Sequence, residues 1–241
     1  IDEHSSITML IIVCLYMNFQ GKVILITGAS SGTGAETRAL VESVLNHYTR
    51  LDILVNNAGT AELGSIEDTS LAQYDRVLNT NVRSVYHLTM LAVPHLIKSK
   101  GSIINVSSVS GLRPSLGFLA YCTSKAAIDQ FTRSLALELA DKGVRVNSVS
   151  PGVILTGIHK RAGMDDAAYA EFLQKAEKSQ PLGRVGTAQE VATVIAFLAS
   201  ENAVIYAHII KKVAPASFKM NSKYACELRS SHFFLVKTRL F

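Results

Sequence analysis

Short apolar runs alternate along this chain with longer segments of helical periodicity. The apolar runs are rich in valine, isoleucine and leucine, and they lie within 22–27, 51–59, 102–106 and 143–149. Such runs are typical of strands buried on both faces of a parallel sheet. Apolar residues elsewhere recur three or four positions apart, which predicts helices within 36–48, 67–99, 121–143 and 187–198. This alternation predicts an α/β domain, and 241 residues are enough for one with a substantial core.

Three glycines, Gly28, Gly32 and Gly34, stand between the first predicted strand and the first predicted helix. Glycines at this junction allow a tight turn and a close approach of the backbone to a pyrophosphate, which the helix N-terminus also attracts. The spacing therefore indicates a nucleotide site, and a plain strand–helix turn is the alternative.

Tyr121 and Lys125 are four residues apart in a predicted helix, so they share one face. An ammonium beside a phenol favours the phenolate, and we expect it to lower the pKa of Tyr121 toward the range needed for general acid–base catalysis. Ser108, thirteen residues upstream of Tyr121, ends the strand predicted at 102–106. A half-buried tyrosine beside a solvated lysine is the alternative reading of the pair.

These motifs occur together with Asn56-Asn57-Ala58-Gly59, in an order that resembles the short-chain dehydrogenase/reductase family, and most closely 3-oxoacyl-[acyl-carrier-protein] reductases. The resemblance covers 17–203. It implies an α/β fold, a doubly wound Rossmann-type parallel sheet with helices on both faces. It also implies an NAD(P)-dependent oxidoreductase that interconverts a ketone and a secondary alcohol.

The resemblance assigns four catalytic residues. Tyr121 exchanges a proton with the substrate oxygen, and Lys125 lowers the pKa of Tyr121 and holds the nicotinamide ribose. Ser108 donates a hydrogen bond to the developing oxyanion, and Asn81 holds a water that links Lys125 to solvent. A polar residue that only faces a neighbouring helix is the alternative for Asn81.

The cofactor implied is NADP or NAD. The residues expected to contact it are Gly28, Ser30, Ser31, Gly32, Thr33, Gly34, Asn57, Ala58, Gly59, Tyr121, Lys125, Pro151, Gly152, Ile154 and Thr156. The substrate is expected to be a small carbonyl or alcohol, which the polar segment 156–180 covers without revealing its identity. Relatives pair the helices of Asn81 and Tyr121 between subunits, so we expect a homo-oligomer.

The chain is shorter than the family pattern between the glycine turn and Asn56. About two βα units are absent, which places the join near 35–38 and removes the second and third strands. A right-handed crossover to the next strand then requires the first helix to change faces, because about 98% of such crossovers are right-handed. Either the glycine turn or the hand of the crossover must change. The lost edge also carries the residue that reads the adenosine ribose, so we expect weakened cofactor binding and no readable NAD/NADP preference.

The two ends of the chain do not match the family. We expect a poorly ordered leader at 1–16, with a membrane-dipping helix as the alternative, and a basic tail at 204–241, of which 204–210 has the composition of a substitute strand. The net charge of +5 comes from this tail, so it does not predict a nucleic-acid partner for the domain.

No apolar run reaches the length of a membrane span, and three scattered cysteines indicate a reducing compartment without a disulfide framework or a metal site. We therefore expect a cytoplasmic protein that binds neither membrane nor nucleic acid. Two other readings stay open: a catalytically impaired, truncated isoform that acts by binding or dimerisation, and a mis-assembled gene product that does not fold stably.

Overall fold

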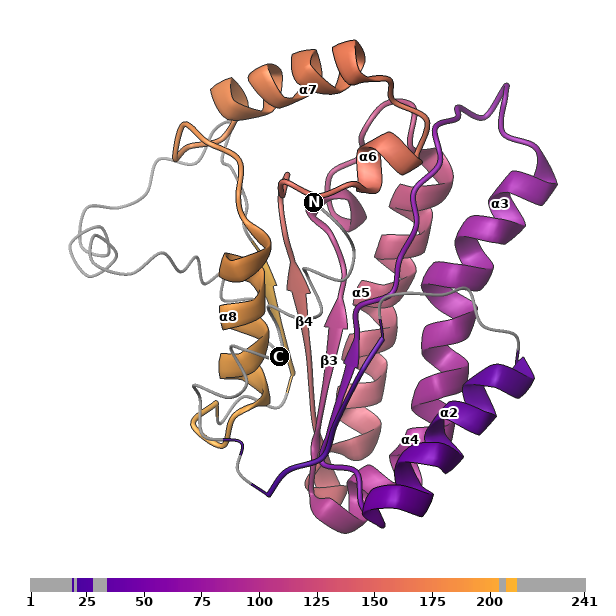
Figure 1. Cartoon of the computed structure of the whole chain (residues 1–241), viewed down its shortest axis with the longest axis vertical. Coiled ribbons are helices and arrows are strands. Elements are labelled where there is room, and N and C mark those ends of the chain that lie inside the picture. The colour runs from indigo at the N-terminus through magenta and orange to yellow at the C-terminus, as the bar shows by residue number, and fades with distance from the viewer. Residues whose placement is uncertain (1–18, 20, 28–33, 204–206, 212–241) are drawn as a thin grey trace.

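The computed structural model describes residues 19, 21–27, 34–203 and 207–211. Its centre is one sheet of five parallel strands in the order β1-β2-β3-β4-β5 (Figure 1). The strands are β1 (Ile24–Ile26), β2 (Ile53–Asn56), β3 (Ser102–Val106), β4 (Arg145–Ser150) and β5 (Ala207–Lys211). The predicted α/β fold is confirmed.

Helices cover both faces of the sheet. The described α-helices are α2 (Gly34–Tyr48), α3 (Leu71–Leu78), α4 (Ser84–Ser99), α5 (Leu119–Leu139), α6 (Ile158–Arg161), α7 (Asp166–Ser179) and α8 (Ala188–Ala199), of which α6 and α7 lie beyond the carboxyl ends of the strands (Figure 1). The α2, α4 and α5 helices pack on one face and α8 packs on the other (Figure 1). A capping box of Thr187 and Glu190 begins α8.

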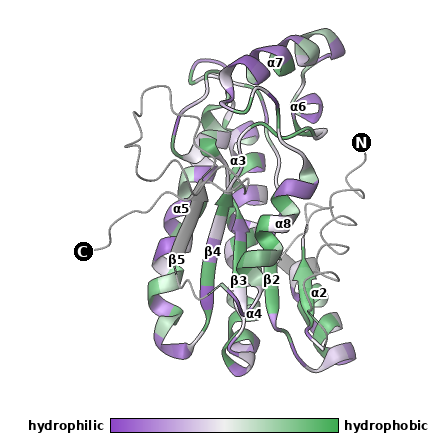
Figure 2. Cartoon of the chain, turned by 90° about the vertical axis from the view of Figure 1, so that its left-hand side faces the viewer, coloured by the Kyte–Doolittle hydropathy of each residue, from purple (hydrophilic) through white to green (hydrophobic). Residues whose placement is uncertain are grey.

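The core consists of two apolar layers separated by the sheet. Leu54 and Ile103 point toward α4 and α5, whereas Ile53 and Ile104 point toward α8. This alternation follows from the two-residue period of a strand. Figure 2 shows the resulting hydrophobic colouring of β2 and β3 between the helices.

The β1 strand pairs directly with β2, with Ile24 opposite Ile53 and Leu25 opposite Leu54. The sheet is therefore continuous although the second and third strands of the family pattern are absent, as the sequence predicted. Among the described residues β1 pairs with β2 alone, so it is the outer strand of this sheet.

The crossover between β1 and β2 keeps the same hand as the next two. The α2 helix lies on the face of α4 and α5, and its Val41 packs into the same core layer as Leu88 and Leu96. Each of these crossovers leads to the next strand on the same side of the sheet order. Crossovers whose helices lie on the same face of the sheet therefore have the same hand. Of the two features that could change, the crossover is preserved, and the residues of the glycine turn, 28–33, lie outside the described part of the chain.

The segment predicted as one helix at 67–99 is divided. A π-helical turn, Asn79–Arg83, joins α3 to α4 and carries the buried Asn81. At the other end, β5 pairs with β4 in parallel, so a substitute strand forms at 207–211. The expected leader and the rest of the basic tail lie outside the described residues, and within the described residues no helix is long and apolar enough to span a membrane.

Candidate active site

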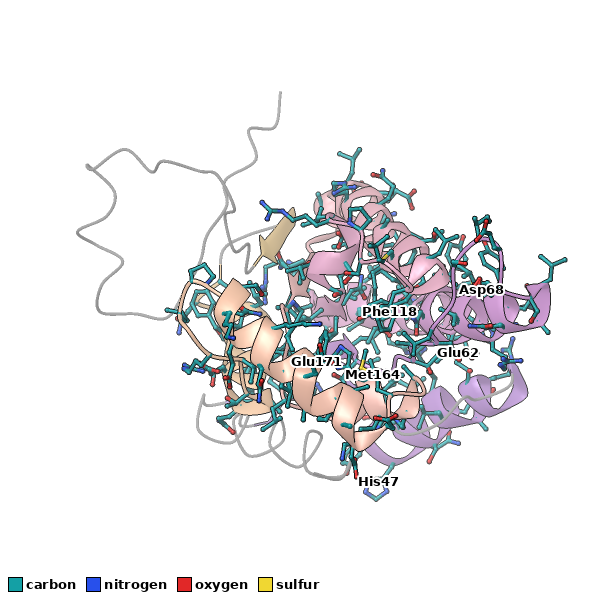
Figure 3. All side chains as sticks on the ribbon, turned by 90° about the horizontal axis from the view of Figure 1, so that it is seen from above. His47, Glu62, Asp68, Phe118, Met164 and Glu171 are labelled. Atoms are coloured by element: carbon teal, nitrogen blue, oxygen red, sulfur yellow. The ribbon has the colours of Figure 1, made fainter. Side chains whose placement is uncertain are left out.

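A cavity of about 540 Å³ opens at the carboxyl ends of β2, β3 and β4. Ligands of open parallel sheets bind at this end, because the loops that follow the strands converge there. The cavity is lined by Ser108, Tyr121 and Lys125 and is bounded on the far side by residues of α6 and α7. In Figure 3, seen from above, Phe118 and Met164 of its wall lie toward the middle of this end of the molecule.

Ser108 and Tyr121 meet across this cavity. Ser108 follows β3 in an extended conformation and caps the 3-10 turn Val109–Gly111, whereas Tyr121 lies in the first turn of α5. The turn approaches α5 closely, and a Cβ at Gly111 would lie 2.8 Å from the carbonyl carbon of Lys125, so glycine is required there. The Ser108 hydroxyl lies close enough to the phenol of Tyr121 to lower its pKa.

The pKa of Tyr121 is raised above its usual value, contrary to the expectation from the sequence. Burial of the phenol is the largest cause, the nearby Ser108 hydroxyl works against it, and the neighbouring Cys122 raises the pKa further. Spacing along a helix predicts that Lys125 is near, but it does not reveal how deeply the phenol is buried. In this structure desolvation therefore dominates over the lysine.

Lys125 lies beneath Tyr121 with its amine 5.6 Å from the centre of the phenol ring. The side chain is buried, and its Nζ donates a hydrogen bond to the Val106 carbonyl at 2.9 Å. Burial lowers the pKa of Lys125 to about 8, and the negative charge of Asp129, one helical turn away, partly restores it. The ammonium is thus a cation whose charge is lost just above neutral pH.

Asn81 connects the loop after β2 to the helix of Tyr121. Its Oδ1 accepts from the Thr60 amide at 2.8 Å, and its Nδ2 donates to the Thr60 carbonyl at 2.8 Å and to Ser124 Oγ at 2.9 Å. Ser124 in turn donates to the Tyr121 carbonyl at 2.7 Å. The π-helical turn, a feature often found at functional sites, turns this asparagine inward. The water assigned to Asn81 stays a prediction.

The residues predicted to hold the nicotinamide end lie around the cavity. Those that line it, besides Tyr121 and Lys125, are Asn57, Gly59, Pro151, Gly152, Ile154 and Thr156. A Cβ at Gly59 would lie 3.4 Å from Lys125 Nζ and 3.5 Å from Asn81 Oδ1, so glycine leaves open the space beside the amine. This arrangement fits the nicotinamide-ribose half of a dinucleotide.

The remaining residues predicted to contact the cofactor do not line the cavity in the described part of the chain. Ala58 does not line it, and its amide donates to Thr27 Oγ1 at 3.2 Å. Gly34 begins α2, and the predicted contacts Gly28, Ser30, Ser31, Gly32 and Thr33 lie outside the described residues.

Sequence reasoning missed several residues of this site. Thr27 accepts from the Asn57 and Ala58 amides at 3.2 Å and thereby joins β1 to the loop after β2. Its place at the end of a strand, directly before the glycines, was a usable signal. The aromatic residues Phe118, His159 and Phe172 also line the cavity, but no motif marks them.

Comparison with known proteins gives one consistent picture. Residues 31–210 match the protein family described as Enoyl-(Acyl carrier protein) reductase. Two curated relatives are a 3-oxoacyl-[acyl-carrier-protein] reductase of Thermotoga maritima, 34% identical over 77% of this chain and 93% of its own, and a meso-2,3-butanediol dehydrogenase of Serratia marcescens, 38% identical over 68% of this chain and 64% of its own. The chain thus spans less than two thirds of the Serratia relative.

Solved structures agree with the sequence matches. A short-chain dehydrogenase/reductase from Caenorhabditis elegans, crystallised with cofactor, is 37% identical and superposes with a TM-score of 0.69 over 75% of this chain and 71% of its own. The ligand-free aldohexose dehydrogenase of Thermoplasma acidophilum is 27% identical, with a TM-score of 0.71 over 83% and 87%.

Proposed function

Because this chain belongs to the short-chain dehydrogenase/reductase family, we propose that it interconverts a ketone and a secondary alcohol by hydride transfer. Tyr121 serves as the general acid and base, and NADP or NAD supplies or accepts the hydride. The observation that carries this proposal is that Ser108, Tyr121 and Lys125 line one cavity, with the Ser108 hydroxyl close enough to Tyr121 to lower its pKa.

The hydroxyl groups act together on the substrate oxygen. In the reducing direction, Tyr121 gives its proton to the oxygen while Ser108 donates a second hydrogen bond to the developing charge. The raised pKa of Tyr121 keeps the phenol protonated at neutral pH, which suits a proton donor. Lys125, when charged, favours the phenolate that remains after transfer, and Asn81 fixes the helix turn that carries both residues.

A second candidate is a truncated family member with impaired catalysis that acts by binding or dimerisation. The position of β1 as the outer strand of the described sheet favours it, because the family strands that flank the adenosine half of the cofactor are missing beside it. The two candidates differ in whether hydride reaches a substrate.

Hydride transfer is tested with NADPH and NADH deuterated at both C4 positions, and ethyl acetoacetate as the probe ketone. We expect the alcohol product to carry one deuterium on its carbinol carbon, as read by mass spectrometry. Tyr121→Phe should lower the rate by about 10³-fold while circular dichroism stays unchanged, because the proton donor alone is removed.

Tyr48→Phe is the matched control, since Tyr48 is exposed at the end of α2, away from the cavity. It should leave the rate unchanged. A rate in Tyr121→Phe close to that of the wild type would refute the assignment of the proton donor. A folded wild type without any deuterium transfer would favour the impaired isoform.

A further inference from the structure

A continuous wall of aromatic rings leads away from Tyr121. The ring centroid of Phe118, directly before α5, lies 6.3 Å from that of Tyr121 and 6.3 Å from that of His159 on α6. The His159 ring in turn lies 4.4 Å from the ring of Phe172 on α7. All four residues line the cavity, so the wall extends from the proton donor to the helices that cover it.

His159 is the polar member of this wall. Its Nδ1 is buried and has no hydrogen-bond partner among the described residues. Burial lowers the pKa of His159, so the imidazole is neutral at physiological pH and carries one proton. In the described part of the chain, Nδ1 is unsatisfied in either tautomer, but a proton on it could reach no acceptor, whereas a proton on Nε2 can be donated to a ligand in the cavity. The proton therefore belongs on Nε2, the ring nitrogen left for a ligand.

The surroundings of His159 favour a neutral ligand. Met164 and Leu63 add apolar surface to the same cavity. Lys160, next along the chain, is paired with Asp166 at 2.6 Å. Arg161 also lines the cavity and makes an interaction within the chain. What this wall offers a substrate is flat apolar surface with an N–H donor.

We propose that His159 is a specificity-determining residue that donates a hydrogen bond from Nε2 to an oxygen on the distal end of the substrate. The substrate class is a neutral ketone or alcohol with a flat, unsaturated ring body that packs against Phe118 and Phe172. Phe118 lies between Tyr121 and His159, with its ring centroid 6.3 Å from each of theirs. The substrate is therefore a fused two-ring compound that packs on Phe118, with the carbonyl at one end and the oxygen acceptor at the other. The turnover part of this inference rests on the proposed function.

The test compares two ketones of nearly equal shape, 7-methoxy-1-tetralone and 7-ethyl-1-tetralone, of which the first alone carries the distal acceptor. Their substituents are meta to the carbonyl-bearing ring carbon, so the two carbonyl groups have nearly equal reactivity. The wild type should prefer the methoxy compound by about three- to tenfold in kcat/KM, the worth of one neutral hydrogen bond, and chiefly through KM. His159→Phe keeps a ring but has no N–H, so it should abolish the preference. His159→Gln keeps a donor and should retain part of it.

His47→Phe is the matched control, because His47 is an exposed residue of α2. It should leave the preference unchanged. Equal use of both ketones by the wild type, or an unchanged preference in His159→Phe, would overturn the inference.

Calorimetric titration of the two ketones into wild type and His159→Phe tests binding without turnover. A methoxy preference in binding that depends on His159 supports the inference even if no ketone is reduced, in which case the proposed function alone fails. Reduction of ethyl acetoacetate without any discrimination between the tetralones supports the function and overturns the inference. Binding of neither tetralone to the folded protein also overturns it.

Discussion

The centre of the sheet and its β1 edge differ in the number of strands and buried side chains that stabilise them. At the centre, β3 is hydrogen-bonded to strands on both sides, and buried side chains join it to the helices. At the edge, β1 consists of three residues and pairs with β2 alone among the described residues. The centre contains the Ser108–Tyr121 pair, whereas the missing strands beyond β1 would have flanked the adenosine half of a dinucleotide.

Polar side chains strengthen the centre further. Asn56 Nδ2 donates to Asn105 Oδ1 at 2.8 Å, and Asn105 Nδ2 donates to Thr132 Oγ1 of α5 at 2.9 Å. This buried series fixes β2, β3 and α5 relative to one another. A parallel sheet is assembled from units that contact mainly their neighbours, so units can be lost at one edge without moving the residues at the centre.

The largest effect on stability should come from the polar network of the centre. Asn81→Leu leaves the Thr60 amide and carbonyl and the Ser124 hydroxyl without their partner, and we expect it to lower the free energy of unfolding by about 3–5 kcal/mol. Urea denaturation measures this loss. Asn79→Leu, at an exposed position of the same π-helical turn, should cost less than about 0.5 kcal/mol, and equal losses would contradict the account.

The two regions can be compared directly through one pair of leucines. Leu54 of β2 and Leu25 of β1 are opposite each other in the register and belong to the same core layer. Leu54 is fully buried and Leu25 lies in the outer strand, so we expect Leu54→Ala to cost about 4 kcal/mol and Leu25→Ala about 2 kcal/mol. Urea midpoints at constant slope measure both, and a larger loss at Leu25 would show that the edge is the better-packed region.

A smaller effect should appear in the pH profile of the centre. Lys125 is charged below its pKa of about 8, and the phenol of Tyr121 stays protonated well above that, so kcat/KM for ketone reduction should be level below neutrality and fall above pH 8. Asp129 raises the pKa of Lys125, so Asp129→Asn should move the fall to lower pH. A fall that stays in place, or moves upward, would remove Lys125 as the titrating group.

Much of this could be predicted from the sequence, for physical reasons that differ between residues. Continuous apolar runs predicted four strands, because β-branched residues buried on both faces leave little ambiguity. The junction of β1 with β2 followed from the missing βα units. The pKa of Tyr121 could not be predicted, because the burial of its phenol depends on which elements the fold packs around α5. The wall of Phe118, His159 and Phe172 comes from three elements that only the fold brings together.

The centre of the sheet is intact, whereas its β1 edge is truncated. The most direct test of this difference compares the affinity for the nicotinamide half of the cofactor with the affinity for the whole dinucleotide. Reduced nicotinamide mononucleotide, NADH and NADPH are titrated separately, with the fluorescence of the reduced nicotinamide as the readout. Because the half that fits the cavity is common to all three, we predict dissociation constants within about tenfold of one another and none as tight as micromolar. Micromolar binding of NADH or NADPH, about 100-fold or more tighter than the mononucleotide, would contradict the account.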